Sequence, residues 1–410
     1  MNRSDRRIRV AVCATHPIQY QAPLWRALAA RPGLQVHVFF GSDLSVRGYR
    51  DREFGVDVKW DVPLTAGYEH TFLSRDPTLQ HLTFRRPRAR GLARALGEFG
   101  ADVALVNAYN GLFWVDCILT ARLLGIPLVM RHEASDVAMQ RSPLQSGIRD
   151  ALLRVLYAQI SVFAAIGTEA RRHLRRLGVP ASRIGSAPYC VDTDMLEKQV
   201  QEWRPRRQEV RMSLGIAPED FVLLFSGKLI EKKQPLLIPE AVRRLPPALQ
   251  KRMHLIVVGD GEQRAEMEAA SRAVFGARLH LAGFVNQSEL GRWYTAADCL
   301  VLPSKRGAGE TWGLVVNEAL QFGIPAIVSD GVGCGADLVG SKTGAVFCSE
   351  SAVSFSDAMF RLMDQATKYE TTLQEHCWQK VSEFSLAVAT AGLAETFGSV
   401  RNRTENSMIL

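Results

Sequence analysis

Short runs of apolar, often β-branched residues alternate with helix-like segments along most of this chain. Residues 9–13 form such a run, residues 22–30 follow with a helical pattern, and residues 34–40 return to the strand pattern. Parallel strands need crossover connections, usually helices, and helices placed in this way cover both faces of the sheet. The order of elements therefore predicts an α/β fold with doubly wound parallel sheets.

The alternation occurs twice in the 410 residues, on either side of a polar, proline-containing stretch. Further strand-like runs lie at residues 103–106, 128–130, 162–166, 221–225, 254–258, 278–281, 299–302 and 326–328. Helical patterns separate them, at residues 113–124, 147–161, 168–177, 236–244, 262–274, 288–296 and 314–322. We expect an N-terminal Rossmann-like domain at 1–190, a hinge or linker at 191–207, a second Rossmann-like domain at 208–383, and a C-terminal helix and tail at 384–410 that pack back on the first domain.

The formal net charge of +8 is concentrated in the first half of the chain. Residues 1–190 contain 26 Lys and Arg against 15 Asp and Glu, whereas the remainder carries a small net negative charge. Two arginine clusters, at residues 85–90 and 171–176, lie in this basic half. They form a solvated face, or they face nucleic acid, an anionic lipid or a phosphorylated substrate.

The sequence has no uncharged apolar run of 18 or more residues, and its basic N-terminus lacks the apolar core of a signal peptide. A cytoplasmic location is therefore expected. The seven cysteines are scattered without a Cys-x-x-Cys pair, which argues against a disulfide framework or a zinc site. We expect them to be small core residues.

Glycines and cations follow the strands of the second half, where ligands of doubly wound sheets bind. Gly227 and Lys228 follow the strand at 221–225, and Lys233 lies five residues beyond Lys228. A glycine lets the backbone approach a ligand, and two flexible ammonium groups suit a diphosphate. Two ordinary surface lysines are the alternative.

The next two strands also end in glycine. Gly259 opens a Gly-Asp-Gly turn similar to a dinucleotide fingerprint. Arg264 stands in place of the third glycine and the segment lies in the second domain, so we do not interpret it as an NAD site. Phe284 and Val285 follow Gly283, where exposed backbone suits the edge of a nucleobase. An ordinary turn after the strand is the alternative.

A glycine-rich loop precedes the last helical pattern of this half. If the helix begins near Gly313, the N–H groups of Leu314 and Val315 and the helix dipole form a phosphate site. Glu318, on the second turn, would then accept both hydroxyls of a ribose, and Glu310, before the helix, would lie near a sugar ring. Two exposed acids are the alternative.

In order and spacing, these motifs resemble the C-terminal domain of the retaining GT-B glycosyltransferases of family 4. The matching segments are Gly227-Lys228-Leu229 with Lys233, Gly259-Asp260-Gly261, Gly283-Phe284-Val285, Ala297-Asp298 with Pro303-Ser304, Glu310 with Glu318, and Gly323-Ile324-Pro325. The resemblance is specific over residues 210–348 and looser in the first half. Lys228 replaces the usual arginine, which keeps the charge but loses the guanidinium fork, and Ala336-Asp337 replaces a common Pro-Glu pair.

The first half carries fewer family signatures. His132 follows a strand, as does the family histidine that contacts the donor sugar, and a buried core histidine is the alternative. His16, Gln19 and Tyr20 belong to a His-Pro-x-Gln-Tyr pattern similar to that of a subset of the family. The segment stands where many members have a Gly-Gly loop, so the acceptor stays open.

The resemblance implies transfer of a sugar from a nucleoside diphosphate sugar to a hydroxyl acceptor with retention of configuration, in cell-surface polysaccharide or glycolipid synthesis. It implies catalysis at His132 and Glu310, an acceptor side at His16, Gln19 and Tyr20, and donor binding by Gly227, Lys228, Lys233, Gly259, Phe284, Val285, Gly313, Leu314, Val315 and Glu318. Neither a divalent metal, nor a cofactor other than the donor, nor a nucleic acid is expected. An anionic or lipid-linked acceptor and a peripheral membrane contact would suit the basic half.

Two other functions stay open. A nucleotide-sugar 2-epimerase of GT-B fold would need acids and histidines across the cleft but no acceptor site, and product analysis with donor alone separates it. A non-catalytic nucleotide-sugar-binding protein would show no donor turnover.

Overall fold

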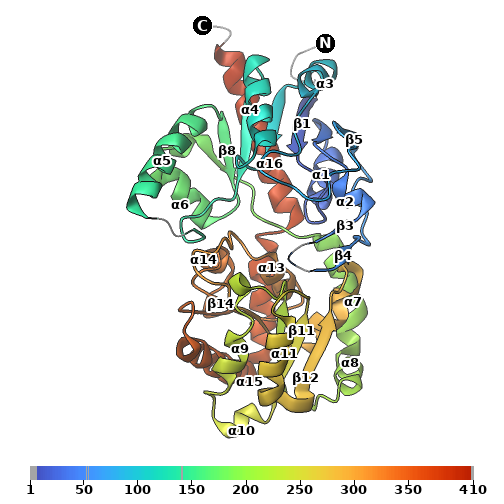
Figure 1. Cartoon of the computed structure of the whole chain (residues 1–410), viewed down its shortest axis with the longest axis vertical. Coiled ribbons are helices and arrows are strands. Elements are labelled where there is room, and N and C mark those ends of the chain that lie inside the picture. The colour runs from blue at the N-terminus through green and yellow to red at the C-terminus, as the bar shows by residue number, and fades with distance from the viewer. Residues whose placement is uncertain (1–6, 52, 54, 140–141, 408–410) are drawn as a thin grey trace.

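The computed structural model describes residues 7–51, 53, 55–139 and 142–407, which form two α/β domains stacked along the long axis (Figure 1). The sheet of the N-terminal domain is parallel throughout, in the order β5-β2-β1-β6-β7-β8-β9. Its strands are β1 (Ile8–Ala14), β2 (Leu34–Phe40), β5 (Glu69–Phe72), β6 (Val103–Val106), β7 (Leu128–His132), β8 (Val162–Ala165) and β9 (Ile184–Ser186). The expected doubly wound α/β fold is confirmed for this half.

Helices cover both faces of this sheet. One face packs against α3 (Leu92–Phe99), α4 (Leu112–Leu123), α5 (Pro143–Ala158) and α6 (Thr168–Arg176). The other face packs against α1 (Ala22–Ala29) and α16 (Leu386–Ser407). Alternate residues of one strand serve the two cores: Ala11 and Cys13 of β1 face the first group of helices, whereas Val10 and Val12 face the second.

The C-terminal domain repeats the plan with a parallel sheet in the order β12-β11-β10-β13-β14-β15. Its strands are β10 (Phe221–Ser226), β11 (Met253–Val258), β12 (Leu279–Gly283), β13 (Cys299–Leu302), β14 (Ala326–Ser329) and β15 (Gly344–Phe347). Its helices are α7 (Thr193–Trp203), α8 (Arg207–Ser213), α9 (Leu237–Val242), α10 (Pro247–Gln250), α11 (Arg264–Phe275), α12 (Leu290–Ala296), α13 (Leu314–Gln321), α14 (Gly335–Leu338) and α15 (Ala352–Ser382).

The chain passes between the domains twice. Residues 191–207, expected as a hinge or linker, are mostly helical: Asp192 caps α7, and Gln199 of α7 donates to the carbonyl of Gln287 at 2.8 Å. Most of this segment therefore packs on the C-terminal domain. After α15 the chain returns, and α16 contacts α1, β8 and β9 of the N-terminal domain.

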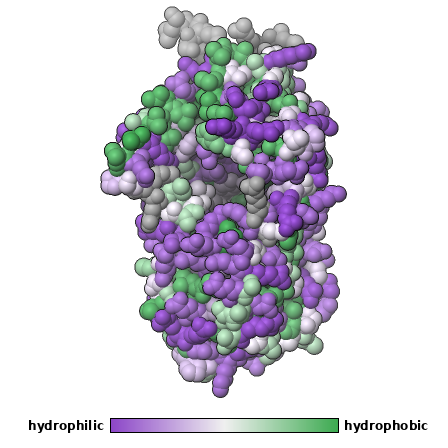
Figure 2. All heavy atoms as spheres, viewed as in Figure 1, coloured by the Kyte–Doolittle hydropathy of each residue, from purple (hydrophilic) through white to green (hydrophobic). Residues whose placement is uncertain are grey.

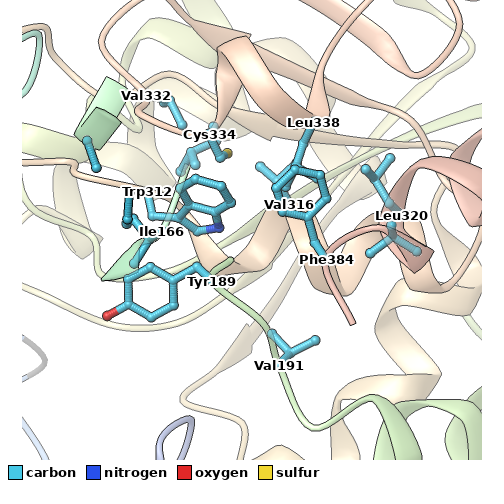
Figure 3. Close-up of a cluster of buried hydrophobic side chains, with 14 of the residues drawn as sticks. Ile166, Tyr189, Val191, Trp312, Val316, Leu320, Val332, Cys334, Leu338 and Phe384 are labelled. Atoms are coloured by element: carbon cyan, nitrogen blue, oxygen red, sulfur yellow. The ribbon is translucent and has the colours of Figure 1, made fainter. Parts of the chain in front are cut away.

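Near the first of these crossings, apolar side chains from both domains form one continuous core (Figure 3). Trp312, from the C-terminal domain, packs beside Tyr189, with ring centroids 6.0 Å apart. Asn317 joins the two segments because it accepts from the Trp312 indole at 2.8 Å and donates to the carbonyl of Tyr189 at 3.1 Å. This side of the molecule is therefore tightly packed.

A small antiparallel hairpin leaves the N-terminal domain after α2 (Leu44–Arg47) and reaches toward the C-terminal domain (Figure 1). Its strands are β3 (Tyr49–Arg50) and β4 (Asp57–Val58). No sequence pattern indicated this hairpin. It matters because its turn and the loop that follows meet the carboxyl ends of the second sheet.

Candidate active site

A cleft of about 730 Å³ lies between the two domains, at the carboxyl ends of both sheets. Most of the residues singled out from the sequence line it: His16, Gln19, Tyr20, Gly227, Lys228, Lys233, Gly259, Phe284, Val285, Leu314, Val315 and Glu318. Gly313 and Glu310 flank the cleft lining, and His132 lines a different pocket. The sequence therefore located the cleft but not its whole shape.

The backbone of the C-terminal wall is tight where two strands end. A Cβ atom on Gly259, whose φ is +135°, would lie 1.9 Å from the carbonyl oxygen of Gly227. On Gly227 the corresponding position meets nothing within 4 Å. Gly259 is thus required by the packing of two loops, whereas Gly227 leaves the wall of the cleft open to a ligand.

Lys228 is engaged by two carboxylates of the hairpin turn. Its Nζ lies 3.0 Å from each carboxylate oxygen of Asp51 and 2.8 Å from Oε2 of Glu53. Lys232 lies 3.5 Å from the other oxygen of Glu53. Burial is the largest single influence on Glu53 and opposes its ionisation, but the hydrogen bonds and positive charges of Lys228 and Lys232 together outweigh burial and lower the pKa of the carboxyl. The cations expected to hold a diphosphate therefore hold acidic side chains in this structure.

Lys233 and Glu310 form an ion pair with each other. Ser304, two residues after the end of β13, also donates to Glu310, with 3.1 Å between the two oxygens. The loop that carries Glu310 is fixed on its other side by the N-terminal domain, since Gly309 donates to the carbonyl of Ala138 at 2.7 Å. Glu310 is thus held between the cleft and the N-terminal domain.

Glu318 is buried at the wall of the cleft, 8% exposed. The hydroxyl of Tyr294 donates to its Oε2 at 2.6 Å. Burial raises the pKa of Glu318 to about 7, because the hydrogen bond from Tyr294 compensates only in part. Helix α13 begins after Gly313, which has a φ of +106°, so the N–H groups of Leu314 and Val315 lie at its N-terminus beside the cleft.

The hairpin loop also reaches Phe284 and Val285. The ring of Trp60 lies 6.1 Å from that of Phe284, and both line the cleft. Next to them, Asn286 donates to the carbonyl of Lys59 at 2.8 Å, and the N–H of Ser288 donates to Asp61 at 3.1 Å. The loop that follows the β3–β4 hairpin therefore forms part of the cleft wall, although no motif in the sequence indicated it.

On the N-terminal wall, His16, Gln19 and Tyr20 occupy the loop between β1 and α1. Nδ1 of His16 lies 2.9 Å from the hydroxyl of Thr15, and burial lowers the pKa of this histidine to about 4. Burial also raises the pKa of Tyr20 to about 12. Both side chains are therefore neutral hydrogen-bonding groups at neutral pH.

His132 lies in a second, smaller hollow of about 370 Å³, which we call the His132 pocket. Its ring is 2% exposed and stacks between Tyr109 and His173, with centroids 6.4 Å and 5.4 Å away. Burial and the neighbouring His173 lower its pKa to about 3, so the imidazole is uncharged. Gly309 and Thr311, on either side of Glu310, close this pocket, which separates His132 from the lysines of the cleft.

The His132 pocket contains polar groups that the sequence did not single out. Both polar atoms of the Asn107 side chain are buried without a hydrogen-bond partner among the residues that the structure describes. Arg149 lines the same pocket and donates to the Tyr109 hydroxyl at 2.8 Å. A buried amide without partners costs stability, and at the wall of a pocket it is free to bond a ligand or a water molecule.

Half of the arginines in the two clusters form ion pairs within their own domain. Their ion pairs are Arg86 with Asp76, Arg88 with Asp116, Arg172 with Glu169, and Arg176 with Asp136 and Asp150. Arg85, Arg90, Arg171 and Arg175 form no ion pair with a described residue. The clusters are thus less available to a partner than their sequence suggests.

Comparison with known families agrees with this geometry. The family described as Glycosyl transferases group 1 matches residues 206–376, and the Glycosyl transferase 4-like domain matches residues 17–190. The chain belongs to the GT-B glycosyltransferases of family 4. This family 4 enzyme is therefore a glycosyltransferase, and the two matches fall on its two domains.

Curated relatives of this glycosyltransferase also transfer sugars. It is 27% identical over 330 residues to D-inositol 3-phosphate glycosyltransferase 1 of Catenulispora acidiphila. The aligned region covers 75% of this chain and 77% of that protein. It is 23% identical over 322 residues to alpha-D-kanosaminyltransferase of Streptomyces kanamyceticus, 76% and 80% of the two chains.

Solved structures share the fold of this glycosyltransferase. HepE of Anabaena in complex with UDP superimposes with a TM-score of 0.68 at 14% identity, over 96% of this chain and all of that chain (100%). Sucrose-phosphate synthase of Thermosynechococcus elongatus gives 0.68 at 18% identity, over 96% and 99%. Within the described part of the chain, no group of residues suited to hold a metal ion and no helix able to cross a membrane is present.

Proposed function

We propose that this glycosyltransferase moves a sugar from a nucleoside diphosphate sugar to a hydroxyl acceptor and retains the anomeric configuration. The observation that carries the proposal is the interdomain cleft, in which Lys228, Lys233, the start of α13 and Glu318 line one wall. Such groups recognise a diphosphate and a ribose. HepE, which has the same fold, was crystallised with UDP-glucose, and this supports a nucleotide sugar as ligand.

In this proposal the diphosphate lies between the two lysines and the N–H groups of Leu314 and Val315. Glu318 accepts the ribose hydroxyls, and the base lies near Phe284. Fixed positive charge at the diphosphate stabilises the negative charge that grows there as the glycosidic bond breaks. Because side chains and a helix terminus supply that charge, the proposed reaction needs neither a divalent metal nor a cofactor other than the donor.

The donor sugar would extend from the diphosphate toward Glu310, with His132 on the far side of the Glu310 loop. The acceptor oxygen forms its bond to the anomeric carbon on the face that the diphosphate leaves, and the departing diphosphate oxygen takes the acceptor proton. An uncharged His132 would contribute a hydrogen bond to the sugar, since its lowered pKa excludes an imidazolium at neutral pH.

We propose that the acceptor belongs to cell-surface polysaccharide or glycolipid synthesis at the cytoplasmic face of a membrane. His16, Gln19 and Tyr20 stand on the wall opposite the donor residues, where an acceptor hydroxyl would enter. The positive charge of residues 1–190 supports an anionic or lipid-linked acceptor.

A thermal-shift screen of UDP-, GDP- and ADP-sugars, with and without EDTA, tests the donor. One nucleotide class should raise the melting temperature, since a ligand at about 100 times its Kd stabilises the native state by about 2.7 kcal/mol. NMR of the product should show the donor's anomeric configuration. Absence of a thermal shift with every donor would overturn the nucleotide-sugar assignment, and a product of inverted configuration would overturn retention. Loss of transferase activity in EDTA would overturn metal independence. Formation of a 2-epimer from donor alone would identify an epimerase.

A further inference from the structure

The outer face of α5 carries a stripe of large apolar side chains. Leu144, Ile148, Leu152 and Val155 are 74%, 58%, 67% and 67% exposed. Their spacing of four, four and three residues places them along one side of the helix. A surface helix normally presents polar residues on that side, so this face needs a partner.

The adjacent helix α4 extends the same surface. Leu119, Leu123 and Leu124, at its far end, are exposed, Leu123 by 87%. The opposite faces of α4 and α5 share one buried core, since Ile118 of α4 and Leu153 of α5 belong to the same cluster. Because both helices cover the same face of the N-terminal sheet, their outward faces point to the same side, and Figure 2 shows hydrophobic residues gathered over α5 and α4 in the upper left of the molecule.

The charges around this surface favour an anionic partner. Arg122 of α4, Arg154 of α5 and Arg175 of α6 are exposed and form no ion pair with any residue that the structure describes. The acids of these helices form ion pairs: Asp116 with Arg88, Asp150 with Arg176, and Glu169 with Arg172. An apolar stripe bordered by unpaired arginines is the pattern of a surface that lies in the interface of an anionic bilayer.

The same helix connects this surface with the site. Arg149, on α5, lines the His132 pocket together with Gly309 and Thr311, beside Glu310. We propose that the α4–α5 face, defined by Leu119, Leu123, Leu124, Leu144, Ile148, Leu152 and Val155, docks on an anionic membrane surface and so presents a lipid-linked acceptor to the interdomain cleft. The acceptor clause rests on the proposed function, whereas the docking does not.

Sedimentation of the full chain with vesicles tests the docking. The vesicles are phosphatidylcholine with or without about 30 mol% phosphatidylglycerol, at low and at high salt. The test variant is Ile148→Glu with Leu152→Glu, and the matched control is Val353→Glu with Phe360→Glu, whose native side chains are 55% and 50% exposed on α15 of the other domain. All four positions are exposed, so melting temperatures should stay near the wild-type value.

We expect the wild type and the α15 control to bind anionic vesicles, and the α5 variant to lose about tenfold or more in binding, because two charges replace apolar groups in the interface. Raised salt or neutral lipid should weaken wild-type binding. Absence of wild-type binding, or equal binding by the α5 variant, would overturn the proposal, as would a dimer in light scattering that only the α5 variant abolishes. Binding of UDP and GDP, measured by calorimetry on the same proteins, should be unchanged, so a failed docking leaves the donor assignment to be judged separately.

Discussion

Lys228 Nζ lies 3.0 Å from both carboxylate oxygens of Asp51, a residue of the other domain and 177 positions earlier in the chain. Both side chains are mostly shielded from solvent, 24% and 13% exposed. The contact places an acidic group against the cation assigned to the donor diphosphate. Donor binding and this ion pair therefore compete for one ammonium group.

Asp51→Asn should tighten binding of the free nucleoside diphosphate. In the wild type the ion pair between Lys228 and Asp51 must break before Lys228 can bind the phosphate oxygens. Removing an ion pair of about 1 kcal/mol should therefore raise the affinity about fivefold. Calorimetry with UDP and GDP measures it, with Asp57→Asn, an exposed acid of the same hairpin, as the control. Weaker binding by Asp51→Asn would show that the aspartate helps to hold the donor.

The pH dependence of nucleotide affinity should report Glu318. Its pKa is raised to about 7 by burial, so the carboxylate that accepts ribose hydroxyls forms only as the pH rises through that value. Affinity for UDP or GDP should therefore increase between pH 6 and 8 in the wild type more than in Glu318→Gln. Equal pH profiles for the two proteins would contradict the ribose role.

The same raised pKa has a consequence for stability. A carboxyl whose folded pKa exceeds its unfolded value stabilises the fold most below the unfolded pKa and loses that contribution as the pH rises through the folded pKa. Between pH 5 and 8 the unliganded wild type should lose about 2 kcal/mol of unfolding free energy relative to Glu318→Gln. Urea unfolding at the two pH values measures the difference.

Asn107→Leu should leave the protein at least as stable as the wild type while lowering sugar transfer. The Asn107 amide is buried without partners in the described structure, so an apolar side chain of similar size removes a cost of about 1 kcal/mol or more. Asn317→Leu is the contrasting variant, because Asn317 is bonded to Trp312 and Tyr189 and its loss should destabilise the protein. Similar destabilisation by both variants would make Asn107 an ordinary structural residue.

The strands were predictable because their apolar runs are compact. The run at residues 34–40 is β2 with the same bounds, and β13 likewise matches residues 299–302. The edge strands β5 and β15 were not predicted because many of their residues are only partly buried, so their hydrophobic patterns are weak. Helix α15 was also not indicated, although Phe355, Met359 and Leu362 of its buried side recur at helical spacing.

Local motifs placed most of the cleft, since a glycine or lysine directly after a parallel strand must lie at the ligand edge of its sheet. They gave no information on contacts between domains. The bond from Lys228 to Asp51, the approach of Trp60 to Phe284 and the separation of His132 from the lysines all depend on how the two sheets face each other. The ion pairs between the two arginine clusters and nearby acids could not be predicted from the sequence either.

The central claim is that nucleotide binding at Glu318, in the interdomain cleft, is separate from sugar chemistry at Glu310 and His132, where the cleft borders the His132 pocket. Calorimetry with the nucleoside diphosphate selected by the donor screen, combined with donor turnover, tests it on Glu318→Ala, Glu310→Ala and His132→Ala. Glu318→Ala should weaken nucleotide binding by about 1.5 to 3 kcal/mol, the contribution of a hydrogen bond to a charged group. Glu310→Ala and His132→Ala should bind the nucleotide nearly as the wild type does but turn over more slowly, because contacts to the sugar matter most in the transition state. Loss of nucleotide binding in those two variants, with wild-type binding in Glu318→Ala, would contradict the account.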